Sequence, residues 1–266
     1  MAKEIRDRLA IIRGGGDLAT GIAYRLWRAH YKVLMLEIAE PLAIRLTVSA
    51  AAAVFNDGIK IEDMVVKHID STGEVRFDSN EVNILIDGDG KSICELCPVL
   101  VVDAIMAKRN TGTNQEMAPI VIAVGPGFCA PKDVHAVVET KRGHYLGRVL
   151  YDGSALPNTG VPGIINGYGI ERLLRSPGSG HVEPLRQIGD CVIAGEAVAS
   201  VNGLPVISQM DGVVRGLIHR SVTAFEGMKI GDVDPRQDAK YCCTFSDKVL
   251  AIGGGVLEAA AWLSGK

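Results

Sequence analysis

The chain has 266 residues, of which 47% are hydrophobic and 22% charged, with a formal net charge of −3 at pH 7. This composition predicts a globular chain of one large or two modest domains, and it argues against disorder and against a nucleic-acid partner, because no basic block dominates. No apolar stretch approaches the roughly 20 residues that cross a bilayer, and the charged start does not resemble a signal peptide, so we expect a cytoplasmic protein without a membrane partner.

The first elements follow the layout of a dinucleotide-binding βαβ unit. An apolar run at residues 9–12 breaks into a glycine turn, a helical stretch covers 17–30, and a second apolar run covers 33–36. Glu37 then lies about 20 positions past Gly16, where an acid that binds ribose hydroxyls is expected. The pattern predicts a Rossmann-like start.

The glycine turn matches the phosphate-binding fingerprint, with Ala19 as its small sixth residue. Gly14 permits the tight turn, and Gly16 lets the backbone approach a pyrophosphate. A carboxylate at Asp17 caps free helix amides but would repel a phosphate placed there. We expect contacts to NAD or another dinucleotide from Gly14, Gly15, Gly16, Asp17 and Glu37.

Two later runs, at residues 99–102 and 120–124, are also apolar without alternation, which is typical of parallel strands buried on both faces. Helices are expected at 41–55, with Pro41 in the first turn, and at 104–109, whereas 59–86 is ambiguous. Together, these strands and helices predict the α/β fold class with a Rossmann-like doubly wound parallel sheet.

Polar and glycine residues follow the last of these strands. Asp103, Gly125 and Gly127 lie at the carboxyl edge of the sheet, where open α/β folds bind ligands. Residues 139–148 then gather cations and a histidine. The guanidinium groups of Arg142 and Arg148 suit phosphates, and the imidazole of His144 suits proton transfer; a solvated basic loop explains the same residues.

After residue 150 the chain becomes rich in turns and short β runs. The order of short β runs and glycine turns near 181–235 resembles the sequence pattern of the small β-sandwich in biotinyl and lipoyl carrier domains. The expected tip of its central hairpin is Asn202-Gly203, with no lysine to modify. We therefore expect a smaller, mostly-β domain with the shape of a carrier and without its chemistry.

The last segment reads as a helix with Ser246 as its N-cap. Three successive glycines at 253–255 cost about 1 kcal/mol each in a helix, a cost that close packing on the sheet would offset. The expected organisation is a Rossmann-like nucleotide- or cofactor-binding domain at 1–150, a mostly-β domain at 151–245 and a C-terminal helix at 246–266 that packs back on the first domain.

The six cysteines are expected to be reduced in the cytoplasm. Cys94-x-x-Cys97 has the spacing of a redox pair or of half a metal site, but no second C-x-x-C completes a zinc site, so we expect unlinked thiols and no metal. The role of this pair stays open.

Several long segments follow one another along the chain, among them RGGGDLATGIAYRLWRA, VVDAIMAKRNTGT, ETKRGHYLGRV, DGVVRGL, KIGDVDPR and SDKVLAIGGGVLEA. Together and in this order they resemble the YqeB-type accessory proteins of the selenium-dependent molybdenum hydroxylase system. The N-terminal part is also similar, more distantly, to xanthine dehydrogenase accessory proteins. The resemblance implies a cytoplasmic maturation factor that prepares or inserts a molybdopterin-type cofactor, with the hydroxylase or its cofactor-assembly proteins as partners.

Three functions therefore compete. The first is a maturation factor that binds a nucleotide or molybdopterin-type cofactor. The second is an NAD-dependent oxidoreductase, which Glu37 would favour over an NADP-dependent one, although no Tyr-x-x-x-Lys pair supports it. The third is a non-enzymatic docking protein with a relic Rossmann fold. Whether the chain catalyses a reaction, which ligand it binds and whether it forms an oligomer stay open.

Overall fold

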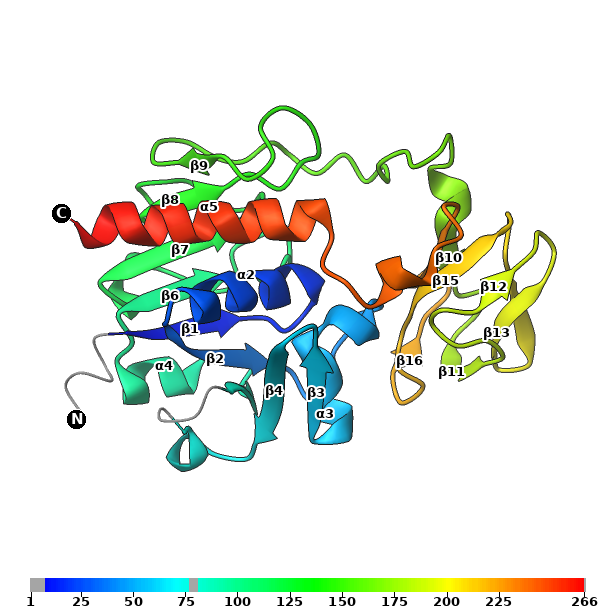
Figure 1. Ribbon diagram of the computed structural model, residues 1–266, viewed down its shortest axis with the longest axis horizontal. Helices are drawn as coiled ribbons and strands as arrows, with labels where there is room; N and C mark the ends of the chain where they lie inside the picture. The colour runs from blue at the N-terminus through cyan, green and yellow to red at the C-terminus, as the bar shows by residue number, and fades with distance from the viewer. Residues whose placement is uncertain (1–7, 77–80, 266) are drawn as a thin grey trace. The chain divides into compact units, whose positions relative to one another are not determined.

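The computed structural model in Figure 1 describes residues 8–76 and 81–265. The chain divides into two compact units. Unit 1 comprises Met1–Ala39, Ser49–Thr159 and Phe245–Lys266, and unit 2 comprises Glu40–Val48 and Gly160–Thr244. Residues 40–48, which the sequence places in the first domain, therefore belong with the later part of the chain.

Unit 1 is built on one mixed sheet, whose described strands follow the order β3-β4-β5-β2-β1-β6-β7-β8-β9. Neighbouring strands from β4 to β8 pair in parallel, whereas β3 and β9 pair antiparallel at the two edges. The strands are β1 (Leu9–Arg13), β2 (Lys32–Glu37), β3 (Gly58–Ile61), β4 (Met64–Ile69), β5 (Val82–Ile86), β6 (Leu100–Asp103), β7 (Ile120–Val124), β8 (Ala136–Val138) and β9 (Val149–Leu150).

The continuous apolar runs of the sequence are strands β1, β2, β6 and β7, at the centre of this sheet. Most of their side chains are buried, which is why the sequence shows no alternation there. Parallel strands also bring their carboxyl ends to one edge of the sheet. That edge holds the glycine turn after β1 and the polar residues that follow the neighbouring strands.

Helices α2 (Asp17–Arg28) and α5 (Asp247–Ser264) lie side by side over one face of this sheet in Figure 1. The predicted helix at 17–30 and the predicted Ser246 N-cap are confirmed, and the Ser246 hydroxyl accepts a hydrogen bond from the Val249 N–H. The other face is covered in part by α4 (Lys91–Leu96), whose Ile93 packs into the aliphatic core. Short helical turns complete the unit: α3 (Ala53–Asn56), η2 (Ala50–Ala52), η3 (Thr72–Glu74) and η4 (Gln115–Met117).

The prediction of a Rossmann-like doubly wound parallel sheet is wrong. In that plan a helix follows each strand and both edges stay parallel. Here the connection from β6 to β7 contains only the 3₁₀ turn η4, and the described chain from β7 to β8 contains no helix. The connection from β2 to β5 leaves the unit at 40–48 and returns through the antiparallel hairpin β3–β4. The sheet is thus mixed and unevenly covered.

Two predicted helices are also wrong. Residues 41–55 form no continuous helix but irregular chain, η1 (Leu46–Val48), η2 and the start of α3, because 40–48 packs in unit 2 while 49–55 packs in unit 1. Residues 104–109 are irregular, and Met106 and Lys108 adopt φ of 63°, which a right-handed helix excludes. In both segments tertiary contacts outweigh local helix propensity.

Unit 2 contains two four-stranded antiparallel sheets in its described residues, with the orders β10-β17-β15-β12 and β14-β13-β11-β16. The strands are β10 (Leu173–Arg175), β11 (Gly180–Pro184), β12 (Cys191–Val192), β13 (Ala197–Val201), β14 (Leu204–Ile207), β15 (Gly212–Leu217), β16 (Thr223–Ala224) and β17 (Lys229–Asp234). Two 3₁₀ turns flank them, η5 (Ile170–Arg172) and η6 (Ala239–Cys242).

The prediction of a biotinyl/lipoyl-type β-sandwich is wrong as well. Register shifts interrupt the pairs β10–β17, β13–β14 and β15–β17. Such bulges bend strands and increase their twist, so the sheets of unit 2 are curled rather than stacked as a regular sandwich. The hairpin turn at Asn202-Gly203 is confirmed: both residues have positive φ, and they join β13 to β14.

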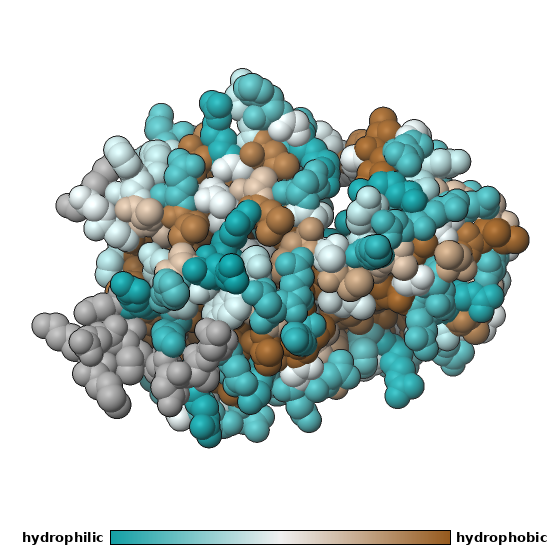
Figure 2. Space-filling view, viewed as in Figure 1, coloured by the Kyte–Doolittle hydropathy of each residue, from teal (hydrophilic) through white to brown (hydrophobic). Residues whose placement is uncertain are grey.

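On the face drawn in Figure 2, hydrophilic residues cover most of the surface and hydrophobic residues lie between them in separate groups. The largest fully buried side chains are aliphatic, among them Ile11, Leu34 and Ile122. Within residues 8–76 and 81–265, no helix combines the length and the hydropathy that crossing a bilayer requires.

Candidate ligand site at the carboxyl edge of unit 1

The glycine turn after β1 is closed by Glu37 rather than left open. The Gly15 N–H donates to Glu37 Oε2 at 2.7 Å, and the Ile38 N–H donates to Glu37 Oε1 at 2.8 Å. Burial raises the pKa of the Glu37 carboxyl group, against these two hydrogen bonds. A phosphate therefore does not fit at the Gly15 N–H, which already has a carboxylate partner.

The two glycines on either side of Gly15 differ. A Cβ on Gly14 would lie 2.8 Å from the Ala104 carbonyl oxygen, so this glycine is required for close packing. A Cβ on Gly16 would meet nothing within 4 Å. Gly16 is the N-cap of α2, so the open part of the turn lies directly before the helix, where Asp17 accepts the Leu18 N–H.

Asp103 takes part in a buried polar contact at the ends of β1 and β6. Arg13 and Asp103 are paired across these strands, and Thr113 joins them. The Thr113 hydroxyl donates to Asp103 Oδ2 at 2.5 Å and accepts from the Arg13 guanidinium at 2.5 Å. Burial raises the pKa of Asp103, while Thr113 and the Arg13 charge oppose the rise. This contact anchors the loop after β6, and its partners are already engaged.

The turn after β7 is also packed against neighbouring chain. A Cβ on Gly125 would lie 2.9 Å from Thr140 Oγ1, and one on Gly127 would lie 2.7 Å from the Arg109 amide nitrogen. Both glycines have positive φ, of 79° and 115°. Their conformation therefore lets two loops approach each other, a role that packing alone explains.

The loop after β8 holds the three side chains that the sequence singles out, and each has a partner. The Arg142 guanidinium forms two hydrogen bonds to Asp247, at 2.8 and 3.0 Å. The Arg148 guanidinium lies over the Tyr145 ring, 4.8 Å from its centroid, and the His144 ring meets the edge of the same tyrosine. His144, Tyr145 and Arg148 contact one another within the exposed loop, whereas Arg142 reaches Asp247 on α5.

Glu139, at the start of this loop, is buried and fully engaged. Its carboxylate accepts hydrogen bonds from the N–H groups of Thr140, Lys141 and Leu156, each at 2.7 Å. The Glu139 side chain therefore fixes the backbone at the start of this loop and is committed to it.

Lys248 is the residue at this edge that the sequence analysis did not select. It occupies the first turn of α5 and is half-buried. Burial lowers the pKa of its ammonium, the charges of Asp17, Glu139 and Asp247 raise it, and that of Arg142 lowers it, for a net decrease. In the sequence, a lysine in the first turn of a helix looks like an ordinary exposed residue. Only the structure shows that its side chain is half-buried.

The structure thus brings Gly16, Asp17, Glu139, Arg142 and Lys248 into one charged neighbourhood. Glu37 and Asp103 lie at the ends of β2 and β6 with backbone and side-chain partners of their own. His144 and Arg148 are oriented toward Tyr145. No group of three or more metal-ligating side chains occurs in the described part of the chain, and Cys94 and Cys97 are exposed free thiols on α4 and at its end.

Comparison with known sequences gives one informative relative. The chain is 43% identical over 258 residues to a protein of Escherichia coli K12 named uncharacterized protein YqeB, and the match covers 96% of this chain and 48% of that protein. The resemblance to YqeB-type proteins is confirmed to this extent. The chain spans about half the length of the curated relative that it matches. No family model matches the sequence.

Comparison with solved structures gives low scores. An aspartoacylase family protein from Mesorhizobium loti has a TM-score of 0.28 and 13% identity, covering 85% of this chain and 84% of that one. An ectoine utilization protein from Ruegeria pomeroyi has a TM-score of 0.25 and 10% identity, covering 84% and 85%. Similarity at this level assigns neither a reaction nor a ligand to this chain.

Proposed function

We propose that this chain is an accessory factor in the maturation of selenium-dependent molybdenum hydroxylases. We further propose that unit 1 binds a phosphate-bearing small molecule, a nucleotide or a molybdopterin-type cofactor, at the carboxyl edge of its sheet. The maturation role rests on the sequence segments that resemble YqeB-type proteins. The observation that carries the binding proposal is the half-buried Lys248 in the first turn of α5.

A cation in the first turn of an 18-residue helix is unfavourable, because the helix dipole is positive there. Three carboxylates lie near the ammonium, and the largest of their effects on its pKa comes from Asp17, which also accepts the Leu18 N–H. The other two are engaged, Glu139 by three backbone N–H groups and Asp247 by Arg142. A bound phosphate would compensate both the burial of the ammonium and the helix dipole. The open backbone at Gly16, which begins α2, gives such a group a second contact.

The test is native mass spectrometry of the purified chain, alone and after addition of NAD, CTP and molybdopterin cofactor in turn. We expect a retained or acquired pterin or nucleotide adduct in the wild type, and at least tenfold weaker retention in Lys248→Met, since a charge-assisted contact contributes about 1.5–3 kcal/mol. Lys132→Met is the matched control, because Lys132 is an exposed lysine of the same unit.

The remaining outcomes of this experiment would favour another function or remove Lys248 from the site. An adduct with NAD alone would favour an oxidoreductase and contradict the maturation role. Absence of any adduct, together with a stable complex with the hydroxylase, would favour a docking protein. Equal adducts in the wild type and in Lys248→Met would remove Lys248 from the site.

A further inference from the structure

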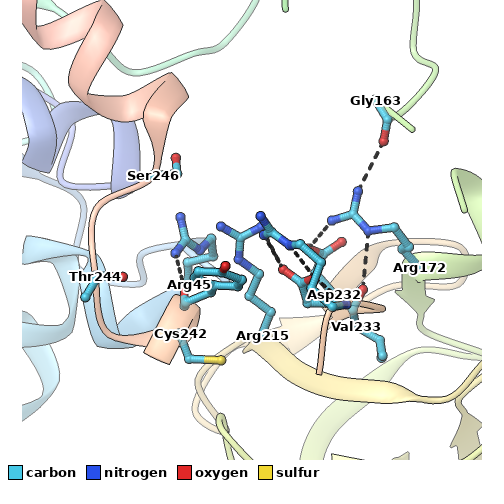
Figure 3. A network of polar contacts seen from close by, with 12 residues as sticks. Arg45, Gly163, Arg172, Arg215, Asp232, Val233, Cys242, Thr244 and Ser246 are labelled. Atoms are coloured by element: carbon cyan, nitrogen blue, oxygen red, sulfur yellow. Dashed lines mark hydrogen bonds and ion pairs between the residues drawn. The ribbon is translucent and has the colours of Figure 1, made fainter. Parts of the chain in front are cut away.

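Two groups of side chains stand out beyond the carboxyl edge of unit 1. The first is the network of unit 2 in Figure 3, which contains three buried arginines. Arg172 donates to Asp232 at 2.8 Å, and Arg215 Nη1 lies 3.2 Å from Asp234 Oδ2. Arg45 donates to a backbone carbonyl of η6. These contacts join β15 and β17 to the segments beside them, so the fold of unit 2 explains this network.

The second group is the pair Cys94 and Cys97, which the sequence singles out by its spacing. Both thiols are free and exposed, and both line one cavity of unit 1. The same cavity is lined by Val99 and Pro119, which directly precede β6 and β7. The pair therefore lies at the amino edge of the sheet, away from the ligand site proposed at the carboxyl edge.

One helical turn separates the two cysteines. The Cys97 N–H donates to the Ile93 carbonyl at 3.0 Å, so the turn that carries both residues is helical. The Cys97 Sγ is directed back along this turn and lies 3.2 Å from the Cys94 carbonyl oxygen. Cβ atoms three residues apart on a helix lie about 5–6 Å apart, and a disulfide needs about 3.5–4.5 Å. A small movement at one end of the turn therefore allows a bond between the two sulfur atoms.

The two ends of α4 differ in how firmly they are held. At its start, the Asp87 carboxylate accepts three backbone N–H groups at 2.8–3.0 Å, and Ile93 is buried in the aliphatic core. At its end, Cys97 adopts a φ of 48°, a left-handed conformation that is unfavourable for residues other than glycine. Cys97 is therefore the residue that can move toward Cys94 while the rest of the helix stays in place.

The cavity beside the two thiols has a volume of about 560 Å³. Apart from the cysteines and Glu116, the described residues that line it are apolar, among them Ile93, Met117 and Ala118. Cavities of this size and composition are typical of sites for small molecules. Both sulfur atoms are thus next to a space that a small substrate can occupy.

We propose that Cys94 and Cys97 form a redox-active dithiol that reduces a low-molecular-weight disulfide bound in this cavity. The thiolate of one cysteine attacks a sulfur of the substrate, which forms a mixed disulfide and releases the first substrate thiol. The thiolate of the other cysteine then attacks the sulfur of the first cysteine, which forms the Cys94–Cys97 disulfide and releases the second substrate thiol. Two electrons pass from the cysteines to the substrate, and the two protons of the cysteine thiols end on the released thiols.

The test is equilibration of the reduced full chain with mixtures of reduced and oxidised glutathione, followed by alkylation and mass spectrometry of the peptide that contains both cysteines. We expect the wild-type peptide to lose two hydrogen atoms and to carry no glutathione. Cys94→Ser and Cys97→Ser should each retain one glutathione on the remaining cysteine, because the second attack is then missing. Cys191→Ser is the matched control, since Cys191 is an exposed free cysteine of unit 2, and its 94–97 pair should react as in the wild type.

The cavity is tested by the rate of oxidation at low salt. Glu116 lines the cavity and is exposed. Glu116→Lys should speed oxidation by anionic oxidised glutathione about two- to fivefold and leave oxidation by neutral bis(2-hydroxyethyl) disulfide unchanged. Glu226→Lys is the matched control, because Glu226 is an exposed carboxylate of unit 2, and neither rate should change.

Three results would contradict the proposal. Glutathione retained on the wild-type pair without a Cys94–Cys97 disulfide, or no reaction of the pair in any mixture, would overturn the dithiol. Equal glutathione rates in Glu116→Lys and Glu226→Lys would overturn the cavity as the place where the substrate binds.

Discussion

The ammonium of Lys248 experiences opposing effects at the carboxyl edge of unit 1. Burial lowers the pKa of this group, and the neighbouring Asp17, Glu139 and Asp247 recover only part of the loss. The charged form is thus less favourable in the folded chain than in water. A bound anion beside the ammonium would offset this cost, which is the reasoning behind the proposed ligand site.

This reasoning predicts the stability of Lys248→Met. Because the folded-state pKa lies below the ordinary lysine value of 10.5, the unfolded chain binds more protons in the range just below pH 10.5. The free energy of unfolding of the wild type therefore rises with pH through that range and falls as pH decreases through the folded-state pKa. In Lys248→Met this dependence disappears, and the free energy of unfolding at pH 7 equals or exceeds that of the wild type. Urea unfolding at several pH values measures both, and a clear loss of stability at pH 7 would identify Lys248 as a structural residue.

At the residue scale, the sequence predicts where several side chains lie but not which groups they contact. The spacing from the glycine turn correctly places Glu37 at the end of the second strand. The same spacing does not show that the Glu37 carboxylate accepts the Gly15 N–H, the donor that a phosphate would need. Lys248, Arg45 and Arg215 escape prediction for a related reason, since charged residues are rarely buried and the sequence does not show which of them are.

The packing of α2 against α5 depends on glycine at some positions of the Gly253–Gly255 run and not at others. A Cβ on Gly253 would lie 2.7 Å from the Gly21 carbonyl oxygen of α2, and one on Gly255 would collide with the Gly147 carbonyl oxygen. A Cβ on Gly254 would meet nothing within 4 Å. The sequence predicts that close packing on the sheet offsets the cost of the run. Close packing occurs at two of the three glycines, but Gly253 packs on α2 rather than on the sheet, and Gly255 packs on the Gly147 loop and on Val138 of β8.

Three alanine substitutions test this difference. Gly253→Ala and Gly255→Ala should each destabilise the chain by about 1–3 kcal/mol, because the added methyl group meets backbone that has no room to move. Gly254→Ala should stabilise it by about 0.5–1 kcal/mol, because alanine is the better helix former where space is open. Chemical denaturation of the three variants gives the values, and the same sign for all three would contradict the packing.

Elements with a single environment along their length are the ones that the sequence predicts well. Strands β1, β2, β6 and β7 are buried on both faces, and α5 begins at a clear N-cap. The predicted helix at 41–55 fails because its residues divide between two units. Likewise, the doubly wound prediction assumed a helix after each strand, and the loops after β6 and β7 replace it.

At the scale of the whole molecule, the proposed site of unit 1 joins residues from opposite ends of the chain. Gly16 precedes α2 and Lys248 lies in the first turn of α5, and both belong to unit 1. Native mass spectrometry of the wild type in millimolar phosphate should therefore show a phosphate adduct that Lys248→Met loses and that Lys132→Met keeps, because only Lys248 contributes its ammonium to the site. An adduct of equal strength in the wild type and in Lys248→Met would mean that phosphate binds elsewhere, and the carboxyl edge of unit 1 would then not be the ligand site.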